Sequence, residues 1–218
     1  MKITHLLVVA LVFLLTPFSA LFAGTGASEM QRLASEVSAL KLGFGDYVLG
    51  SQLTKIQKET AGKNDIKKTL DGTYKFVDGE IYVIAREDDD TVLGIYKNYP
   101  EVPREDLKKI IGDLMMRFEE PTTMAHQKII YWAFNKNGKV SGDVYDFSKT
   151  TGDTDMIATV KFQSSVDILP DPERKSELGA SETAAEEFQK EVNGTNSSVY
   201  VIVSSDPMSK LFLAQVKK

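Results

Sequence analysis

The chain of 218 residues contains no cysteine. A protein without cysteine has no disulfide bond, no thiol nucleophile and no zinc–thiolate centre. Small extracellular domains of eukaryotes usually depend on disulfides, so an exported chain of this size without cysteine is more typical of a bacterial periplasm. The composition therefore favours a bacterial protein.

Histidine is almost as scarce, since the chain has only two, His5 and His126. His5 lies in an apolar N-terminal segment, so no two-histidine metal site of the HExxH kind is predicted in the rest of the chain. The GxSxG turn of serine hydrolases and the GxGxxG fingerprint of dinucleotide-binding proteins are both missing. His126, in "PTTMAHQK", is expected to be an exposed loop residue. We therefore assign no catalytic residue, no cofactor-binding residue, no cofactor and no metal ligand.

An excess of basic residues is also lacking, because the formal net charge is −5. Binding to nucleic acid or to anionic lipid requires basic patches, and the sequence predicts neither. The acidic run at residues 87–90, "EDDD", has neither the alternate spacing nor the central glycine of a calcium loop, so we expect a solvated turn that discourages strand-edge pairing. The acidic segment at residues 143–155 has no recognisable ligand spacing and is expected to be a loop.

The N-terminus has the pattern of a secretory signal peptide. Lys2 precedes an unbroken apolar run at residues 6–15, followed by Pro17 and a stretch of small residues. The run is too short to span a bilayer comfortably. We predict that residues 1–23 are removed by cleavage after Ala23, which places the protein in the periplasm or outside the cell, with no membrane association. No cysteine follows the run, so a lipid-anchored lipoprotein is excluded.

The remaining residues, 24–218, are expected to form a single α+β domain, with sub-units at 24–100 and 101–218 as an alternative division. Antiparallel β-meanders alternate with amphipathic helices. The expected helices are 28–43, 51–62, 103–120 and 181–194, and the expected strands lie within 73–99, 127–147, 155–169 and 197–216.

Three turns define the strand pairs in this interpretation. Asp78-Gly79 is predicted to form a type I′ hairpin turn, and Asn137-Gly138 a second hairpin turn. A turn at Asp206-Pro207 is expected to lead into a final strand. The strongest helix begins at Pro103, and its core-facing stripe is Leu107, Ile110, Ile111, Leu114, Met115 and Phe118.

A helix followed by a hairpin with a glycine turn occurs twice. "LTKI" precedes "FVDGEI", and "LKKI" precedes "FNKNGKV". Two αβ repeats are one explanation, and chance similarity of two short segments is the one we favour.

The segment "IIYWAF", residues 129–134, is apolar on both sides of a predicted strand. Such a strand is normally covered on both faces, so we expect Trp132 to be structural. The alternative is a sheet with one open, aromatic face used for binding, to which Tyr82, Tyr96 and Trp132 would contribute. Glu119 and Glu120 follow the strongest helix, where carboxylates are electrostatically unfavourable, and are expected to be surface residues.

Part of the chain resembles small exported bacterial α/β modules of the SmpA/OmlA and β-lactamase-inhibitor-like type. The resemblance rests on the "LG" step and short helix of "VLGSQLTKIQ", a β-meander, and "DLMMRFEEPTT" before "IIYW". The chain departs from these modules at Glu120-Pro121, where they often have Gly-Pro, and lacks the lipobox cysteine of the lipoproteins. The resemblance implies protein–protein binding in the envelope without catalysis.

The sequence favours an exported, non-enzymatic binding or interaction protein of the bacterial envelope, whose protein or small-molecule partner is left open. Two alternatives remain at this stage. One is a metal-independent hydrolase with paired carboxylates, whose separation a sequence does not reveal. The other is a purely structural envelope component.

Overall fold

The computed structural model describes residues 20–66, 70–151, 155–168 and 196–216, with side chains from residue 28 onward. Most of the predicted signal peptide and the predicted helix at 181–194 lie outside these ranges. Within them, no helix is both long enough and apolar enough to cross a membrane.

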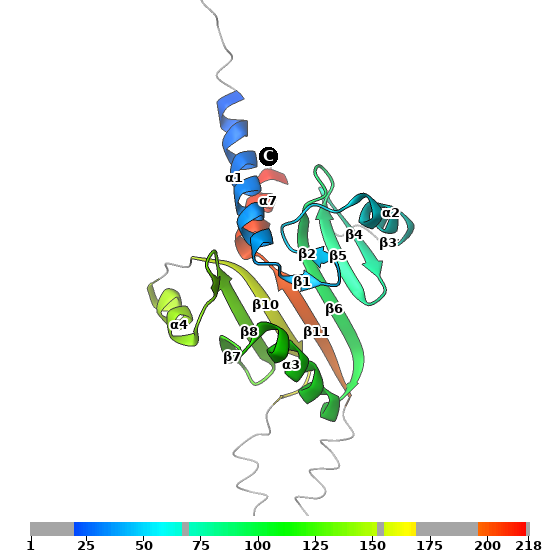
Figure 1. Ribbon diagram of the computed structural model, residues 1–218, viewed down its shortest axis with the longest axis vertical. Coiled ribbons are helices and arrows are strands. Elements are labelled where there is room, and N and C mark those ends of the chain that lie inside the picture. Colours follow the sequence, from blue (N-terminus) through cyan, green and yellow to red (C-terminus); the bar gives the residue numbers. More distant parts are fainter. Residues whose placement is uncertain (1–19, 67–69, 152–154, 169–195, 217–218) are drawn as a thin grey trace, which may run out of the picture.

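The fold is α+β, as predicted, and is built on one antiparallel sheet of nine strands (Figure 1). The strand order is β3-β4-β5-β6-β11-β10-β8-β7, and β9 pairs with β8. The strands are β3 (Asp65–Ile66), β4 (Thr73–Asp78), β5 (Ile81–Arg86), β6 (Val92–Pro103), β7 (Thr123–Ala125), β8 (Ile129–Asn135), β9 (Gly138–Lys139), β10 (Met156–Ser164) and β11 (Asn196–Ser204).

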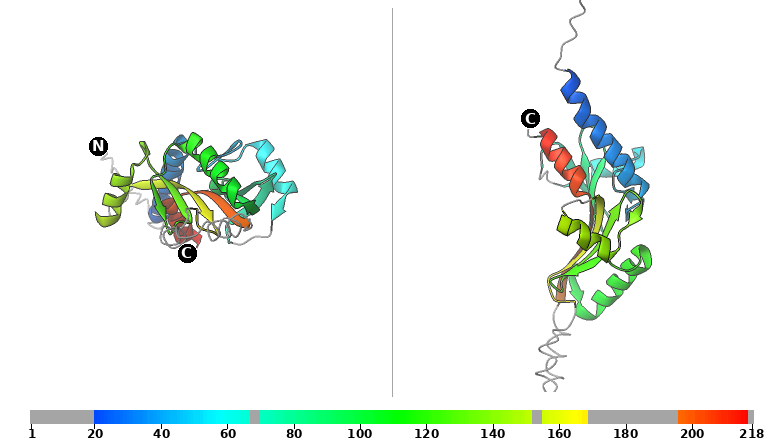
Figure 2. Two further views of the ribbon diagram at one scale, coloured as in Figure 1. Left: turned by 90° about the horizontal axis from the view of Figure 1, so that it is seen from below. Right: turned by 90° about the vertical axis from the view of Figure 1, so that its left-hand side faces the viewer.

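The described helices surround this sheet, together with a small hairpin of β1 (Gly43–Phe44) and β2 (Tyr47–Val48). Figures 1 and 2 show α2 and α3 on one side of the sheet and α7 on the other. The helices are α1 (Ala20–Ala39), α2 (Lys55–Lys63), α3 (Arg104–Phe118), α4 (Gly142–Thr151) and α7 (Asp206–Val216).

The strand order is symmetric about the pairing of β6 with β11. In the first half, α2 leads into β3, β4, β5 and β6, and in the second, α3 leads into β7, β8, β10 and β11. Each half runs from an edge of the sheet to its centre, where the two last strands pair antiparallel. The order of these elements therefore divides close to residue 100.

One face of the sheet forms the core. A row of directly paired residues crosses six strands on this face, and every member is completely buried: Phe76, Val83, Ile95, Val203, Val160 and Trp132. Leu107, Leu114 and Phe118 of α3 are buried in the same core. This face receives the large side chains and α3, so the other face is left for α7 and for different contacts.

Helix α1 begins at Ala20, earlier than the predicted start at residue 28, and runs through the predicted cleavage site. Among the residues of this helix whose side chains are described, the buried ones are Met30, Leu33, Ala34 and Val37, all on the C-terminal side of that site. Cleavage after Ala23 would therefore leave these four residues in the mature protein.

The prediction of a final strand after Asp206-Pro207 is wrong, because this segment is helix α7. The side-chain hydroxyl of Ser205 accepts a hydrogen bond from the backbone N–H of Met208, as an N-cap does. Pro207 fits the first turn of a helix. Met208 and Phe212 are both buried and are four residues apart, which is the spacing of one helical face. The strand prediction was wrong because the short run "KLFLAQV" resembles the apolar pattern of a strand.

The prediction of a loop at 143–155 is also wrong, since α4 occupies Gly142–Thr151. None of its residues is buried, and Phe147 is 69% exposed. Val144 and Phe147 are three residues apart as on one helical face, but both are exposed, so the helix buries no stripe in the core. The acidic residues and the glycine of this segment favoured a loop in the sequence prediction.

The first hairpin is confirmed, but its turn is displaced by one residue. Asp78 still pairs with Ile81, so the two loop residues are Gly79 and Glu80. Only the first of them, Gly79, has a positive φ (58°), as in a type II′ turn rather than the predicted type I′ turn.

Candidate binding surface on the open sheet face

The second face of the sheet carries a cluster of tyrosines. Tyr82 pairs with Tyr96 across β5 and β6, and the two rings stack with centroids 4.6 Å apart and an interplanar angle of 5°. The ring of Tyr200 on β11 lies 6.5 Å from that of Tyr96. Tyr200 is 39% exposed and the other two are half-buried. Stacked, partly exposed rings on a rigid sheet form a preorganised surface for contact.

A lysine lies over these rings. The Nζ of Lys75 on β4 is 5.3 Å from the ring centroid of Tyr82 and 5.1 Å from that of Tyr96, which is cation–π distance. A second lysine, Lys161 on β10, pairs directly with Ile202 on β11, the neighbour of Tyr96. We call the face that carries these side chains the open face.

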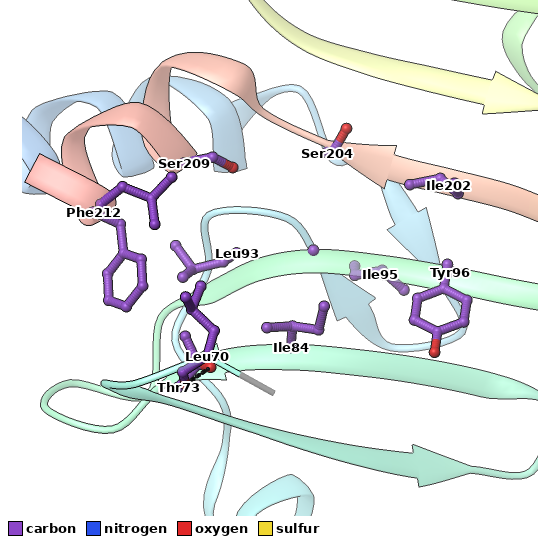
Figure 3. A pocket seen from close by; sticks show the side chains of 12 residues that line it. Leu70, Thr73, Ile84, Leu93, Ile95, Tyr96, Ile202, Ser204, Ser209 and Phe212 are labelled. Atoms are coloured by element: carbon purple, nitrogen blue, oxygen red, sulfur yellow. Dashed lines mark hydrogen bonds between the residues drawn. The ribbon is translucent and has the colours of Figure 1, made fainter. Parts of the chain in front are cut away.

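An apolar pocket of about 220 Å³ opens beside the tyrosines, where α7 lies over the open face (Figure 3). Helix α7 contributes Ser209, Phe212 and Leu213, and no carboxylate lines the pocket. The remaining lining residues come from the sheet and the approach to β4: Leu70, Thr73, Ile84, Leu93, Gly94, Ile95, Tyr96, Ile202 and Ser204.

Two of the three aromatic residues predicted for an open face lie on it, and the third does not. Tyr82 and Tyr96 are stacked there, whereas Trp132 is completely buried on the other face. The indole N–H of Trp132 donates a hydrogen bond of 2.9 Å to the backbone carbonyl of Glu119. Tyr200 was missed, although it alternates along β11 with the buried Val199 and Val201 and this pattern marks it as an outward residue.

His126 lies in the turn between β7 and β8 and is exposed, as predicted. His126 and Gln127 have φ angles of 51° and 53°, and the N–H of Lys128 donates to the carbonyl of Ala125 at 3.2 Å. This is the geometry of a tight hairpin turn, normally occupied by Asn-Gly. The histidine therefore belongs to a turn rather than to the tyrosine cluster.

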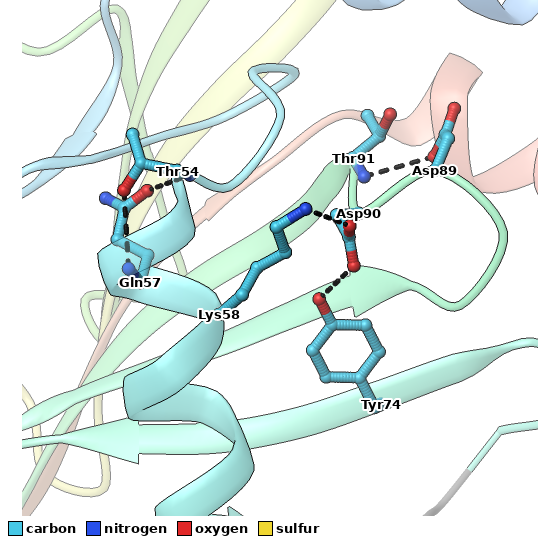
Figure 4. Close-up of polar contacts among 7 residues, drawn as sticks. All are labelled: Thr54, Gln57, Lys58, Tyr74, Asp89, Asp90 and Thr91. Carbon is cyan, nitrogen blue, oxygen red and sulfur yellow. Dashed lines mark hydrogen bonds and ion pairs between the residues drawn. The ribbon is translucent and has the colours of Figure 1, made fainter.

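The acidic run at 87–90 is more than a solvated turn, because its carboxylates hold neighbouring cations. Asp88 and Asp89 pair with the buried guanidinium of Arg86. Asp90 accepts hydrogen bonds from Lys58 of α2 at 3.0 Å and from the hydroxyl of Tyr74 at 2.7 Å (Figure 4). In the part of the chain that the structure describes, no three His, Asp or Glu side chains gather as a metal site would require.

Replacing Asp90 by asparagine is expected to lower the free energy of unfolding by about 1 kcal/mol at pH 7, since a charge-assisted hydrogen bond is lost. Burial by itself raises the pKa of Asp90, but the hydrogen bonds from Tyr74 and Lys58 outweigh it and lower the pKa below its usual value. Because the pKa of Asp90 is lower in the folded protein than in the unfolded chain, its ionised carboxylate stabilises the fold at pH values above the unfolded pKa of about 4. This stabilisation is lost as the pH falls through the folded pKa.

Urea titrations of Asp90→Asn and the unaltered protein should therefore differ at pH 7 and converge as the pH falls below the folded pKa of Asp90. Asparagine tolerates the positive φ of this position (58°), so the backbone should be unaffected. A difference that stays constant with pH would contradict the carboxylate's role.

Glu119 and Glu120 are surface residues, as expected, and a lysine offsets their charge. The Nζ of Lys139 lies 2.8 Å from the carboxylate of Glu119 and donates to the carbonyl of Glu120 at 3.1 Å. The hydrogen bond from Lys139, and then its charge, lowers the pKa of Glu119. This ion pair lies just beyond the C-terminal end of α3. Lys139 is on β9, which is far in the strand order from the strands that carry the tyrosine cluster.

Comparison of the chain with models of protein families, with curated proteins and with solved structures found no match. The function is therefore inferred from the open face and the N-terminal pattern.

Proposed function

We propose that this protein is an exported, non-enzymatic binding protein of the bacterial envelope that holds its ligand on the open face. The observation that carries the proposal is the stacked pair of Tyr82 and Tyr96 directly beside an apolar pocket. Tyrosine offers a large apolar surface and a hydroxyl group while losing little conformational entropy on binding, which makes it a frequent anchor at interfaces.

The pocket has the composition expected of a ligand site. Its walls are mainly aliphatic and aromatic, and its polar groups are a few hydroxyls, those of Thr73, Ser204, Ser209 and Tyr96. Binding pockets typically combine an apolar lining with a small number of polar groups that orient the ligand.

Export and envelope location are supported by the sequence. The apolar run at residues 6–15, Pro17 and the absence of cysteine favour a secreted bacterial chain. The resemblance to exported envelope modules that bind other proteins points in the same direction.

The hydrolase alternative has less support. A glycosidase-like mechanism needs two carboxyl groups facing each other across a cleft. No Asp or Glu side chain lines the pocket on the open face. Binding is therefore the function that this surface supports best.

The test is a photo-crosslinking experiment in living cells of the source organism. A photoreactive phenylalanine derivative at Tyr200 is expected to trap a protein or small molecule, detected as a mass increase of the intact chain. The matched control places the same group at Ile56 on α2, which is 76% exposed and belongs to a helix on the other side of the sheet.

Adducts from position 200 and none from position 56 would support the open face as the binding surface. Equal adducts at both positions, or none at position 200, would rule out this surface.

A further inference from the structure

We propose that the ligand of the open face is a long-chain carboxylate, with its hydrocarbon tail in the pocket beneath α7 and its head group at Lys75. This inference rests on the proposed function and adds the chemical class of the ligand.

The pocket has the size and lining for part of an alkyl chain. Its volume of about 220 Å³ exceeds the roughly 150 Å³ of an engineered apolar cavity that holds benzene. Phe212 and Leu213 of α7 line it together with Ile84 and Ile202 of the sheet. A hydrocarbon tail buried here would be stabilised in proportion to the apolar area that it removes from water.

Gly94 provides the floor of the pocket. A Cβ atom there would meet only ordinary contacts, at 3.9 Å from Ile84 and 4.0 Å from the carbonyl of Val203. The backbone of β6 at this position therefore does not require glycine. Its missing side chain leaves the space open.

Strand pairing divides the open face into three rows. The row nearest the pocket contains Lys75, Ile84, Gly94, Ser204 and Thr159. The next row contains Tyr82, Tyr96, Ile202 and Lys161, and the third contains Asn98, Tyr200 and Gln163. The Nζ of Lys75 lies over the tyrosine rings of the second row, so a ligand with its apolar end in the pocket under α7 has its polar end over the tyrosines beside Lys75.

The charge of the polar end follows from the lysines. Among the paired residues of these three rows, from β4 to β8, the charged side chains are Lys75 and Lys161, and there is no Asp or Glu. The rows are therefore basic, although the whole chain has a net charge of −5. Lys75 is held over the rings of Tyr82 and Tyr96, and Tyr96 also lines the pocket. An anionic head beside the pocket mouth would therefore meet a positioned ammonium group.

Lys161 lies on the opposite flank, two strands from Tyr96 in the sheet. Because neighbouring strands are about 4.8 Å apart, the charged end of the flexible Lys161 side chain lies within a Debye length of the same head group. Lys161 therefore also attracts that head group electrostatically. We expect Lys75 to contribute more than Lys161.

Calorimetric titration of the chain from Gly24 onward with decanoate, decanol and decyltrimethylammonium tests the ligand class with one tail and three head groups. Decanoate should bind with a stoichiometry of one and about fivefold more tightly than decanol, as expected for one partly exposed charge pair. The cation should bind most weakly.

Three variants separate the tail from the head. Gly94→Val should weaken both decanoate and decanol by at least about tenfold, because its side chain fills the pocket, while valine suits a strand. Lys75→Gln should weaken decanoate about fivefold and leave decanol unchanged. The matched control is Lys63→Gln, an equal charge change on the exposed end of α2, and it should change neither affinity.

Other outcomes would overturn the inference. Equal losses in Lys75→Gln and Lys63→Gln would indicate adsorption to overall charge, and an unchanged Gly94→Val would exclude the pocket. A concentration-dependent dimer that decanoate dissociates would show that a second copy covers the face. If decanoate does not bind but crosslinking at position 200 persists, the ligand class is wrong while the proposed function stands. If both fail, the open face is not a binding surface.

Discussion

Replacing Trp132 with alanine is expected to lower the free energy of unfolding by about 3–5 kcal/mol, the cost of removing a large buried aromatic side chain. Trp132 is the largest completely buried side chain of the described residues, and it pairs directly with the buried Val160. Its ring centroid lies 6.1 Å from that of Phe118. The substitution therefore leaves a cavity between β8 and the end of α3.

The loss of a hydrogen bond adds to the cavity. The indole N–H of Trp132 donates to the carbonyl of Glu119, the residue after the last turn of α3. Without the indole, this carbonyl at the end of the helix loses its protein donor. Because Glu119 is exposed, water takes the donor's place, and the lost hydrogen bond adds about 0.5–1.5 kcal/mol.

The control is His126→Ala, in the exposed turn just before β8, which should change stability by less than about 0.5 kcal/mol. Urea titrations of both variants, followed by circular dichroism because Trp132 is the only tryptophan, give the comparison. If Trp132→Ala unfolds at an unchanged midpoint but loses a ligand, the tryptophan belongs to a binding surface after all. If His126→Ala removes an activity at unchanged stability, the non-enzymatic proposal fails.

Gly50→Ala is expected to cost about 2–4 kcal/mol, through backbone strain and a steric clash together. Gly50 has a φ of 78°, a conformation that costs residues with a Cβ atom. A Cβ at this position would also lie 2.5 Å from the carbonyl oxygen of Ala34 in α1. The N–H of Gly50 donates to the carbonyl of Val92 at 2.9 Å, so the chain here is held between α1 and β6 and has little freedom to move.

Gly79→Ala separates the two contributions. Gly79 also has a positive φ, 58°, but a Cβ there has no neighbour within 4 Å. Strain alone should cost about 1 kcal/mol at this turn. Thermal or urea unfolding of the two variants should therefore differ by the cost of the clash, and equal losses would show that contact with α1 does not constrain Gly50.

The sequence by itself determined the α+β class, because the relevant signals are local. Alternation in "TYKFVDGEIYVIARE" and the stripe of Leu107, Leu114 and Phe118 reflect the periods of a strand and of a helix. The β4–β5 hairpin and α3 were predicted for this reason. Local signals failed at α4, which buries nothing, and at α7, where the N-cap Ser205 outweighs an apparent strand pattern.

Only the tertiary structure decided which face of the sheet is open and what lies on it. Trp132 and Tyr96 are both aromatic residues in apolar strands, and nothing local distinguishes them. The register of six strands places Trp132 in the buried row under α3 and Tyr96 on the opposite face with Tyr82 and Tyr200. The pocket likewise depends on α7 returning over β6 and β11, a long-range arrangement that pairs residues separated by about half the chain and that no sequence window contains.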